Sequence, residues 1–169
     1  MIISSSITKA RLLHYFPPSS TVDTADPDDE PIDSWCGFHK DHSLLTGLCS
    51  AMYLSNPNDP KSAEPTIVPS PSPSSGLYIR TRGGELRRVA IPVDGLAFQI
   101  GEALELATDG SLRATPHCVR VGREAGATGV SRETFALFMQ PDVHRQISAK
   151  QTFGQFSKRV FAEHYEAMM

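Results

Sequence analysis

Residues 96–121, LAFQIGEALELATDGSLRATPHCVRV, begin and end with short apolar runs that are kept apart by glycine, proline and polar residues. Short runs of this kind recur along the chain, at 9–16, 35–39, 76–82, 85–91, 95–101, 117–121 and 132–139. Gly83 and Gly84 separate two of them and predict a two-residue hairpin turn. Many short strands divided by turn signals indicate a sandwich, barrel or jelly roll, so we expect a mainly β fold.

The C-terminal stretch 152–165 has a different pattern. Phe153, Phe156, Val160 and Phe161 recur there at helical spacing. This predicts one amphipathic helix that docks an apolar stripe on the body of the protein. We expect these side chains to be core contacts and not a ligand site.

Two stretches, 17–33 and 55–75, predict loop insertions without regular structure. The first is acidic and contains proline, and the second is rich in proline and serine. Repeated proline removes backbone donors, so neither stretch should form a central strand. The first would join a strand to the candidate metal strand described below, which makes it a candidate lid.

The bulk properties narrow the class of protein. A length of 169 residues favours a single domain over 1–169. The net charge of −3 gives no argument for a nucleic acid or membrane partner, and no apolar run approaches the roughly 20 residues of a membrane helix. Three cysteines do not suggest a disulfide framework, and no signal peptide is evident. We therefore expect a cytoplasmic protein.

The segment GFHKDH, at 37–42, is the first candidate for chemistry. On an extended chain His39 and Asp41 point to the same side, where an imidazole and a carboxylate can bind one metal. A histidine from another strand would complete the 2-His-1-carboxylate set used by non-haem iron(II) oxygenases. The other histidines are His14, His42, His117, His144 and His164. His117 is the best placed of these, since it follows Pro116 and opens a strand-like run.

The segment 96–121 resembles the C-terminal catalytic domain of the isopenicillin N synthase-like branch of Fe(II)/2-oxoglutarate oxygenases. In that family an I-G-D-x-L-E-x-x-[TS]-N-G segment leads to the second metal histidine. The matching positions here are Ile100, Gly101, Leu104, Glu105, Thr108, Gly110 and His117. Four other segments resemble the family in the same order: LLHYFPP at 12–18, HKDHSLLTGL at 39–48, RETFALF at 132–138 and the tail at 141–161.

The resemblance implies a double-stranded β-helix, or jelly roll, with a C-terminal helix. It implies Fe(II) bound by His39, Asp41 and His117, and no catalytic residue beyond this metal site. It also implies 2-oxoglutarate as cosubstrate, with Arg132 and Thr134 holding its distal carboxylate. A guanidinium suits that role because it donates two parallel hydrogen bonds. The expected partners are a small organic substrate and O₂.

The chain departs from the family pattern at four points. Glu102 replaces the usual aspartate, and Cys118 replaces the arginine that often follows the metal histidine. In the strand at 12–18 Tyr15 remains a candidate cosubstrate ligand, while Phe16 takes the position expected to offer a phenol. The chain also begins at about the second strand of the fold, so we expect it to lack the family's N-terminal region.

Three functions are therefore compatible with the sequence. The first is an Fe(II)- and 2-oxoglutarate-dependent dioxygenase that oxidises a small organic substrate. The second is a catalytically silent jelly-roll protein that acts in binding or as a scaffold. The third is an iron oxidase that does not use 2-oxoglutarate.

Overall fold

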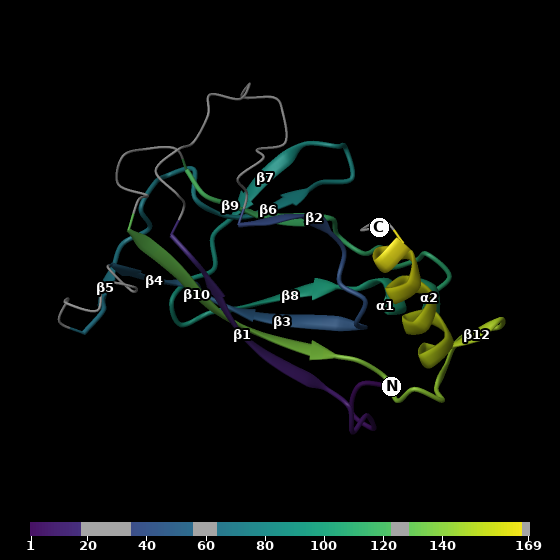
Figure 1. Cartoon of the computed structure of the whole chain (residues 1–169). Coiled ribbons are helices and arrows are strands. Elements are labelled where there is room, and N and C mark those ends of the chain that lie inside the picture. Colours follow the sequence, from purple (N-terminus) through teal and green to yellow (C-terminus); the bar gives the residue numbers. More distant parts are fainter. Residues whose placement is uncertain (18–34, 56–63, 123–128, 167–169) are drawn as a thin grey trace.

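The computed structural model describes residues 1–17, 35–55, 64–122 and 129–166, which form two facing β-sheets, a small two-stranded sheet and two helices (Figure 1). The larger sheet has the order β5-β4-β10-β3-β8, with β1 paired to β10. Its strands are β1 (Lys9–Tyr15), β3 (Leu45–Cys49), β4 (Met52–Ser55), β5 (Thr66–Val68), β8 (Leu96–Ile100) and β10 (Val130–Met139). The mainly β architecture predicted from the sequence is confirmed.

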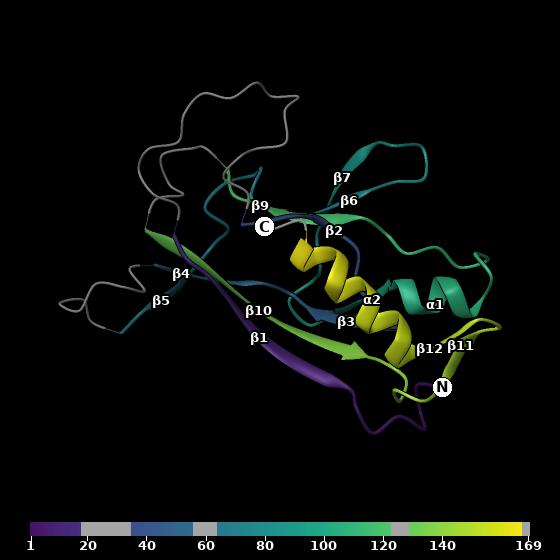
Figure 2. The ribbon, with the colours of Figure 1, turned by 45° about the vertical axis from the view of Figure 1, so that its right-hand side comes forward.

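The smaller sheet has the order β2-β9-β6-β7 and lies across from the larger one in both views (Figures 1 and 2). Its strands are β2 (Cys36–His39), β6 (Gly76–Arg80), β7 (Leu86–Val89) and β9 (His117–Arg120). The remaining elements are α1 (Glu102–Ala107), β11 (Gln146–Ser148), β12 (Gln151–Thr152) and α2 (Phe153–Glu166). Every strand pair is antiparallel among the described residues, as in a jelly roll.

The pairing of β1 with β10 decides which side chains face the space between the sheets. Tyr15 lies opposite Arg132, and Leu13 lies opposite Thr134. Side chains alternate between the two faces of a strand, so these four share the inner face. All four line the same cavity.

Helix α2 packs across one end of the two sheets, beside α1 (Figure 2). Phe153, Phe156 and Val160 are buried there, as the helical spacing predicted. The core cluster that they join comprises Leu44, Ala103, Ile147, Phe153, Phe156 and Val160. Phe161 differs from the expectation, since it is 54% exposed and the buried stripe of the helix is narrower than predicted.

Gly101 joins β8 to α1 at a point where only glycine fits. An added Cβ would lie 2.1 Å from the carbonyl oxygen of Ser43 and 2.9 Å from that of Asp41. The close approach lets the Gly101 N–H donate to the Leu44 carbonyl (3.0 Å) and the Glu102 N–H donate to the Asp41 carbonyl (2.7 Å). The backbone around Asp41 is therefore held by the segment that begins with Ile100-Gly101.

The β6–β7 hairpin corrects the expectation of a two-residue Gly83-Gly84 turn. Thr81 N–H donates to the Glu85 carbonyl (2.8 Å), and Gly84 N–H donates to the Thr81 carbonyl (3.0 Å). Gly84 has a φ of +87°, whereas Gly83 does not have a positive φ. The connection is thus a three-residue loop in which only the last residue takes the left-handed conformation.

The predicted loop insertions have different outcomes. Residues 18–34, which hold almost all of the first, lie outside the described residues. The second was expected to lack regular structure, but Thr66–Val68 form β5. This strand lies at the edge of the larger sheet, which is where proline-rich sequence is tolerated. Among the described residues, no helix has the length and apolar character needed to cross a membrane.

Candidate metal centre and cosubstrate pocket

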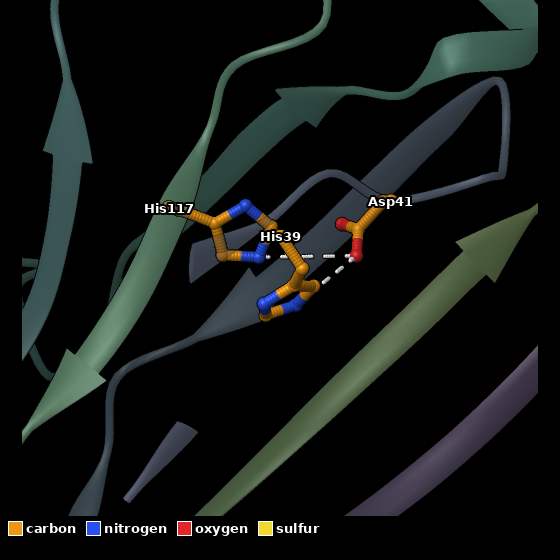
Figure 3. A group of neighbouring side chains, drawn as sticks. All are labelled: His39, Asp41 and His117. Carbon is orange, nitrogen blue, oxygen red and sulfur yellow. Dashed lines mark ion pairs between the residues drawn. The ribbon is translucent and has the colours of Figure 1, made fainter. Parts of the chain in front are cut away.

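His39, Asp41 and His117 come together at one end of the smaller sheet (Figure 3). His39 ends β2 and His117 opens β9, and the two residues are direct partners in the antiparallel register. Their rings lie 4.1 Å apart, centroid to centroid. Asp41 follows β2 by two residues and presents its carboxylate to both rings. The three residues that the sequence singled out are therefore neighbours in space.

The separations between the candidate ligand atoms suit a single ion. Asp41 Oδ1 lies 3.9 Å from His39 Nε2 and 3.8 Å from His117 Nε2. A divalent metal bound at about 2.1 Å by each atom spans at most about 4.2 Å between two ligands. Both distances fall within that limit, so a small divalent cation fits between the side chains.

Both imidazoles are oriented by a hydrogen bond to a nearby backbone carbonyl. His39 Nδ1 lies 2.9 Å from the Gly37 carbonyl, and His117 Nδ1 lies 3.1 Å from the Thr115 carbonyl. Each carbonyl belongs to the residue two places earlier and accepts the Nδ1 proton. The Nε2 atoms then face the Asp41 carboxylate, an arrangement that is usual for metal-binding histidines, although the Gln99 amide nitrogen also lies 3.1 Å from His117 Nε2.

The Asp41 carboxylate is held by its second oxygen. Thr46 Oγ1 donates to Asp41 Oδ2 at 2.6 Å, and Gln99 Nε2 donates to the same oxygen at 3.3 Å. Ser43 Oγ extends this buried chain to Thr46 Oγ1 at 2.9 Å. Gln99 also contacts the ring of His117. Asp41 Oδ1 therefore remains directed at the two imidazoles.

The two histidines differ in their protonation. A hydrogen bond to the Cys36 thiol, 3.6 Å from Nδ1, raises the pKa of His39 to about 9 against the opposing effect of burial. Burial lowers the pKa of His117, and the neighbouring His39 lowers it further. At neutral pH His117 is thus ready to offer a lone pair, whereas His39 must release a proton before it can bind a metal.

This difference predicts a pH-dependent metal affinity. Because a metal must displace the His39 proton, the apparent affinity for Mn²⁺ should rise about tenfold per pH unit up to about pH 9 and then level. In the metal-free protein, protonation of His39 has the opposite effect, since it stabilises the folded state. A folded pKa above the unfolded value contributes stability that is present below about pH 6.5 and lost as the pH rises through about 9.

Calorimetric Mn²⁺ titrations at several pH values check this expectation. Cys36→Ala removes the thiol, so the rise in affinity should end at a lower pH than in the wild type. Cys49→Ala serves as the control, because Cys49 lies on β3 and its thiol makes no hydrogen bond with His39. An affinity that does not change between pH 6 and 9 would contradict the protonation of His39.

The inner-facing side chains of β1 and β10 form a pocket with the three candidate ligands. It is lined by Leu13, Tyr15, His39, Asp41, Thr46, Leu48, Cys49, Leu77, Ile91, His117, Val119, Arg132, Thr134, Ala136 and Phe138. Arg132 is only 6% exposed, and its Nε and Nη1 atoms are buried with no hydrogen-bond partner among the described residues. Two open donors on a buried guanidinium suit an anionic acceptor, and a carboxylate of a ligand would supply one.

Tyr15 supports the same end of the pocket. The guanidinium of Arg132 lies over its ring, 5.2 Å from the centroid. Burial raises the pKa of the Tyr15 phenol, although Arg132 opposes this effect. The phenol therefore stays protonated and can donate a hydrogen bond to an anion beside Arg132. Arg132 and Tyr15 thus offer cationic and phenolic donors in the pocket that the three candidate metal ligands also line.

The expectation that Phe16 takes the phenol position is corrected by the register of β1. Phe16 is 66% exposed and packs edge-on against His14, outside the pocket. Strand alternation turns Tyr15 inward instead. No phenol is therefore lost from the pocket by the presence of phenylalanine at position 16.

The other histidines with described side chains lie away from the centre. His14 pairs with Glu133 at 2.7 Å on the outer face of the larger sheet. His42 turns toward the rings of Phe156 and Phe161, and His144 is exposed. Cys118 is a buried core residue, 2% exposed.

Sequence reasoning missed the residues that orient Asp41. Thr46 was matched only as a position in a motif, and Gln99 carried no signal except its polarity within an apolar run. The motif residues before His117 are structural. Glu105 Oε2 accepts from the Ala114 N–H (2.8 Å), and Gly110 takes a φ of +76° at the end of α1. They position the loop that delivers His117 to the site.

Comparisons with known proteins agree with this architecture. No protein-family model and no curated protein matches the chain. A candidate oxygenase of Shewanella oneidensis has a TM-score of 0.64 and 24% identity, over 96% of this chain and 49% of its own. A candidate 2OG-Fe(II) oxygenase family protein of Caulobacter crescentus has a TM-score of 0.61 and 23% identity, over 92% of this chain and 46% of its own.

A third solved structure is that of the dioxygenase for auxin oxidation 1 of Arabidopsis thaliana, in complex with 2-oxoglutarate. Its TM-score is 0.56 with 18% identity, over 83% of this chain and 41% of its own. The chain thus spans less than half the length of these three structures. The likeness shows that this chain has the jelly-roll fold of solved 2-oxoglutarate oxygenases.

Proposed function

We propose that this chain carries the catalytic centre of a non-haem Fe(II)- and 2-oxoglutarate-dependent dioxygenase that oxidises a small organic substrate. One observation carries the proposal: an oriented set of two imidazoles and a carboxylate shares a pocket with a buried guanidinium, two nitrogens of which have no hydrogen-bond partner among the described residues. A metal-binding scaffold would need only the two imidazoles and the carboxylate. The buried guanidinium suits an anionic ligand in the same pocket, which is what a 2-oxo diacid provides.

Each residue has a distinct part in this proposal. His39, Asp41 and His117 hold the iron on one side and leave its remaining positions to ligands. Arg132, with the Tyr15 phenol and Thr134, binds the distal carboxylate of 2-oxoglutarate. When bound, the iron and the cosubstrate supply O₂ activation, in which 2-oxoglutarate is converted to succinate and CO₂ while a substrate C–H bond is oxidised. The apolar lining, which includes Leu13, Leu77 and Val119, keeps water from the reacting groups.

An anaerobic titration tests the proposal. Addition of Fe(II) and then 2-oxoglutarate to the folded protein should give a visible charge-transfer band, which requires the cosubstrate to chelate the metal. No band would favour the catalytically silent alternative. If O₂ is consumed without formation of succinate, the iron oxidase that does not use 2-oxoglutarate is favoured instead. The cytoplasmic location and the single-domain organisation remain predictions.

Thr46→Val is expected to weaken metal binding without touching a ligand atom. Thr46 is fully buried, and its hydroxyl donates to Asp41 Oδ2 at 2.6 Å. Loss of such a partner costs about 10- to 100-fold in metal affinity, because the carboxylate is no longer oriented. The matched control is Thr66→Val at an exposed position on β5, where the hydroxyl bonds to Ser55 Oγ at 2.6 Å. Mn²⁺ titration of both variants measures the difference, and equal affinities would contradict an orienting role for Thr46.

A further inference from the structure

A second hollow, about 700 Å³ in volume, lies outside the metal pocket and shares no lining residue with it. It is formed by the tip of the β6–β7 hairpin, the end of α1 and the loop before β9. Its lining comprises Lys40, Ile79, Arg80, Thr81, Arg82, Glu105, Asp109, Gly110, Arg113, Ala114, Thr115 and Pro116. The hollow is large enough for a small ligand, and we refer to it as the basic pocket.

The charge of the basic pocket is opposite to that of the whole chain. Four cationic side chains and two carboxylates line it, whereas the chain has a net charge of −3. Lys40, Arg82 and Arg113 make no hydrogen bond or ion pair with another described residue. Glu105 is already engaged by the Ala114 N–H at 2.8 Å. The pocket thus gathers positive charge that the surrounding described carboxylates do not neutralise.

One of the cations is held in place by its own contacts. The guanidinium of Arg80 lies 4.7 Å from the centroid of the Phe38 ring, and its Nη1 donates to the Gly84 carbonyl at 3.3 Å. A positioned guanidinium beside three further cations suits a ligand with several anionic oxygens. Phosphate groups and polycarboxylates both have this chemistry.

The basic pocket also adjoins the metal centre through the backbone. Lys40 stands between the two candidate ligands His39 and Asp41. In the loop before β9, Thr115 and Pro116 directly precede His117, and the Thr115 carbonyl accepts the His117 Nδ1 proton. Residues next to all three candidate ligands therefore line this hollow.

We propose that the basic pocket binds a small multivalent oxyanion, and that its occupancy strengthens metal binding at the triad. The oxyanion site is argued from the basic pocket alone, whereas its effect on metal binding rests on the proposed function. Lys40 is the chain neighbour of both His39 and Asp41, so an anion beside it offsets positive charge close to the metal centre, which favours a divalent cation there. Linkage requires that a bound metal strengthens oxyanion binding by the same factor.

Calorimetry on the metal-free protein tests the oxyanion site. Inorganic tripolyphosphate and citrate are the two probes, and they distinguish a phosphate ligand from a polycarboxylate. Arg82→Gln/Arg113→Gln should weaken the preferred probe at least about tenfold, since two charged donors are lost. Lys150→Gln/Lys158→Gln removes the same charge outside the pocket and should leave the affinity unchanged. No binding of either probe, or equal losses in both double variants, would overturn the site.

A second measurement tests the coupling to the metal centre. Free Mn²⁺ is quantified by electron paramagnetic resonance in sodium sulfate and in sodium chloride of equal ionic strength, because sulfate binds Mn²⁺ only weakly. Wild-type protein should bind Mn²⁺ several-fold more tightly in sulfate, and Arg82→Gln/Arg113→Gln should lose this difference. Equal affinities in the two salts would overturn the coupling. Absence of Mn²⁺ binding in both salts would overturn the coupling and the proposed function, while the oxyanion site would still be decided by calorimetry.

Discussion

Asp41→Asn is expected to lose stoichiometric Fe(II) binding and, with it, all 2-oxoglutarate turnover. The carboxylate is the only anionic group in the triad, and its Oδ1 faces both imidazoles at 3.8 and 3.9 Å. Even the loss of a group that merely orients a ligand costs about 10- to 100-fold in metal affinity, so loss of the ligand itself should cost at least about 100-fold. Asparagine has the shape of aspartate and can still accept from Thr46, which keeps the site folded.

The metal content of the purified variant and an anaerobic Fe(II) titration measure the effect. Glu102→Gln is the matched control, since Glu102 lies beside His42 at 3.7 Å and directs no oxygen at the triad. It should retain wild-type affinity. One tightly bound Fe(II) per chain in Asp41→Asn would show that the carboxylate is not a ligand.

Arg132→Met is expected to change stability and ligand binding in opposite directions. The ligand-free protein holds a buried guanidinium with two nitrogens that have no partner among the described side chains and backbone, which is a cost to folding. Replacement with an apolar side chain of similar length should therefore raise the free energy of unfolding by about 1–3 kcal/mol. The same change removes the cation that holds the distal carboxylate, so affinity for 2-oxoglutarate should fall by about 3 kcal/mol, or roughly 100-fold.

Urea unfolding with and without 2-oxoglutarate separates the two effects. The cosubstrate, added with Mn²⁺, should stabilise the wild type and have little effect on the variant, because a ligand stabilises only the state that binds it. Arg11→Met is the control on the neighbouring strand, where the guanidinium lies over Phe138 and is exposed. Wild-type 2-oxoglutarate affinity in Arg132→Met would remove Arg132 from the cosubstrate site.

Local sequence patterns were sufficient to predict the features that depend on residues close together in the chain. The strand-like runs predicted most of β1, β2 and β6 to β10, and helical spacing predicted α2. Strand periodicity put His39 and Asp41 on one side before any fold was known. Alpha-helix α1 was not predicted, since six residues are too few to show a helical period.

Pairing between distant strands decided what local patterns left open. The register of β2 with β9 places His117 opposite His39, whereas the sequence had pointed to that histidine only by its position after Pro116 and by the resemblance of 96–121. The register of β1 with β10 turns Tyr15 toward Arg132 and leaves Phe16 outside, because a shift of one residue exchanges the faces of a strand.

The sequence by itself determined the fold class, the C-terminal helix and the residue types of the candidate metal centre, because periodicity and motif spacing are local properties of the chain. The tertiary structure decided that Tyr15, and not Phe16, faces the pocket. It also decided that Thr46 and Gln99 hold the Asp41 carboxylate, and that two nitrogens of the buried Arg132 have no hydrogen-bond partner in the part of the chain that the structure describes. These properties depend on contacts between residues far apart in the chain, and hydrogen bonding and burial are defined only once the sheets have packed.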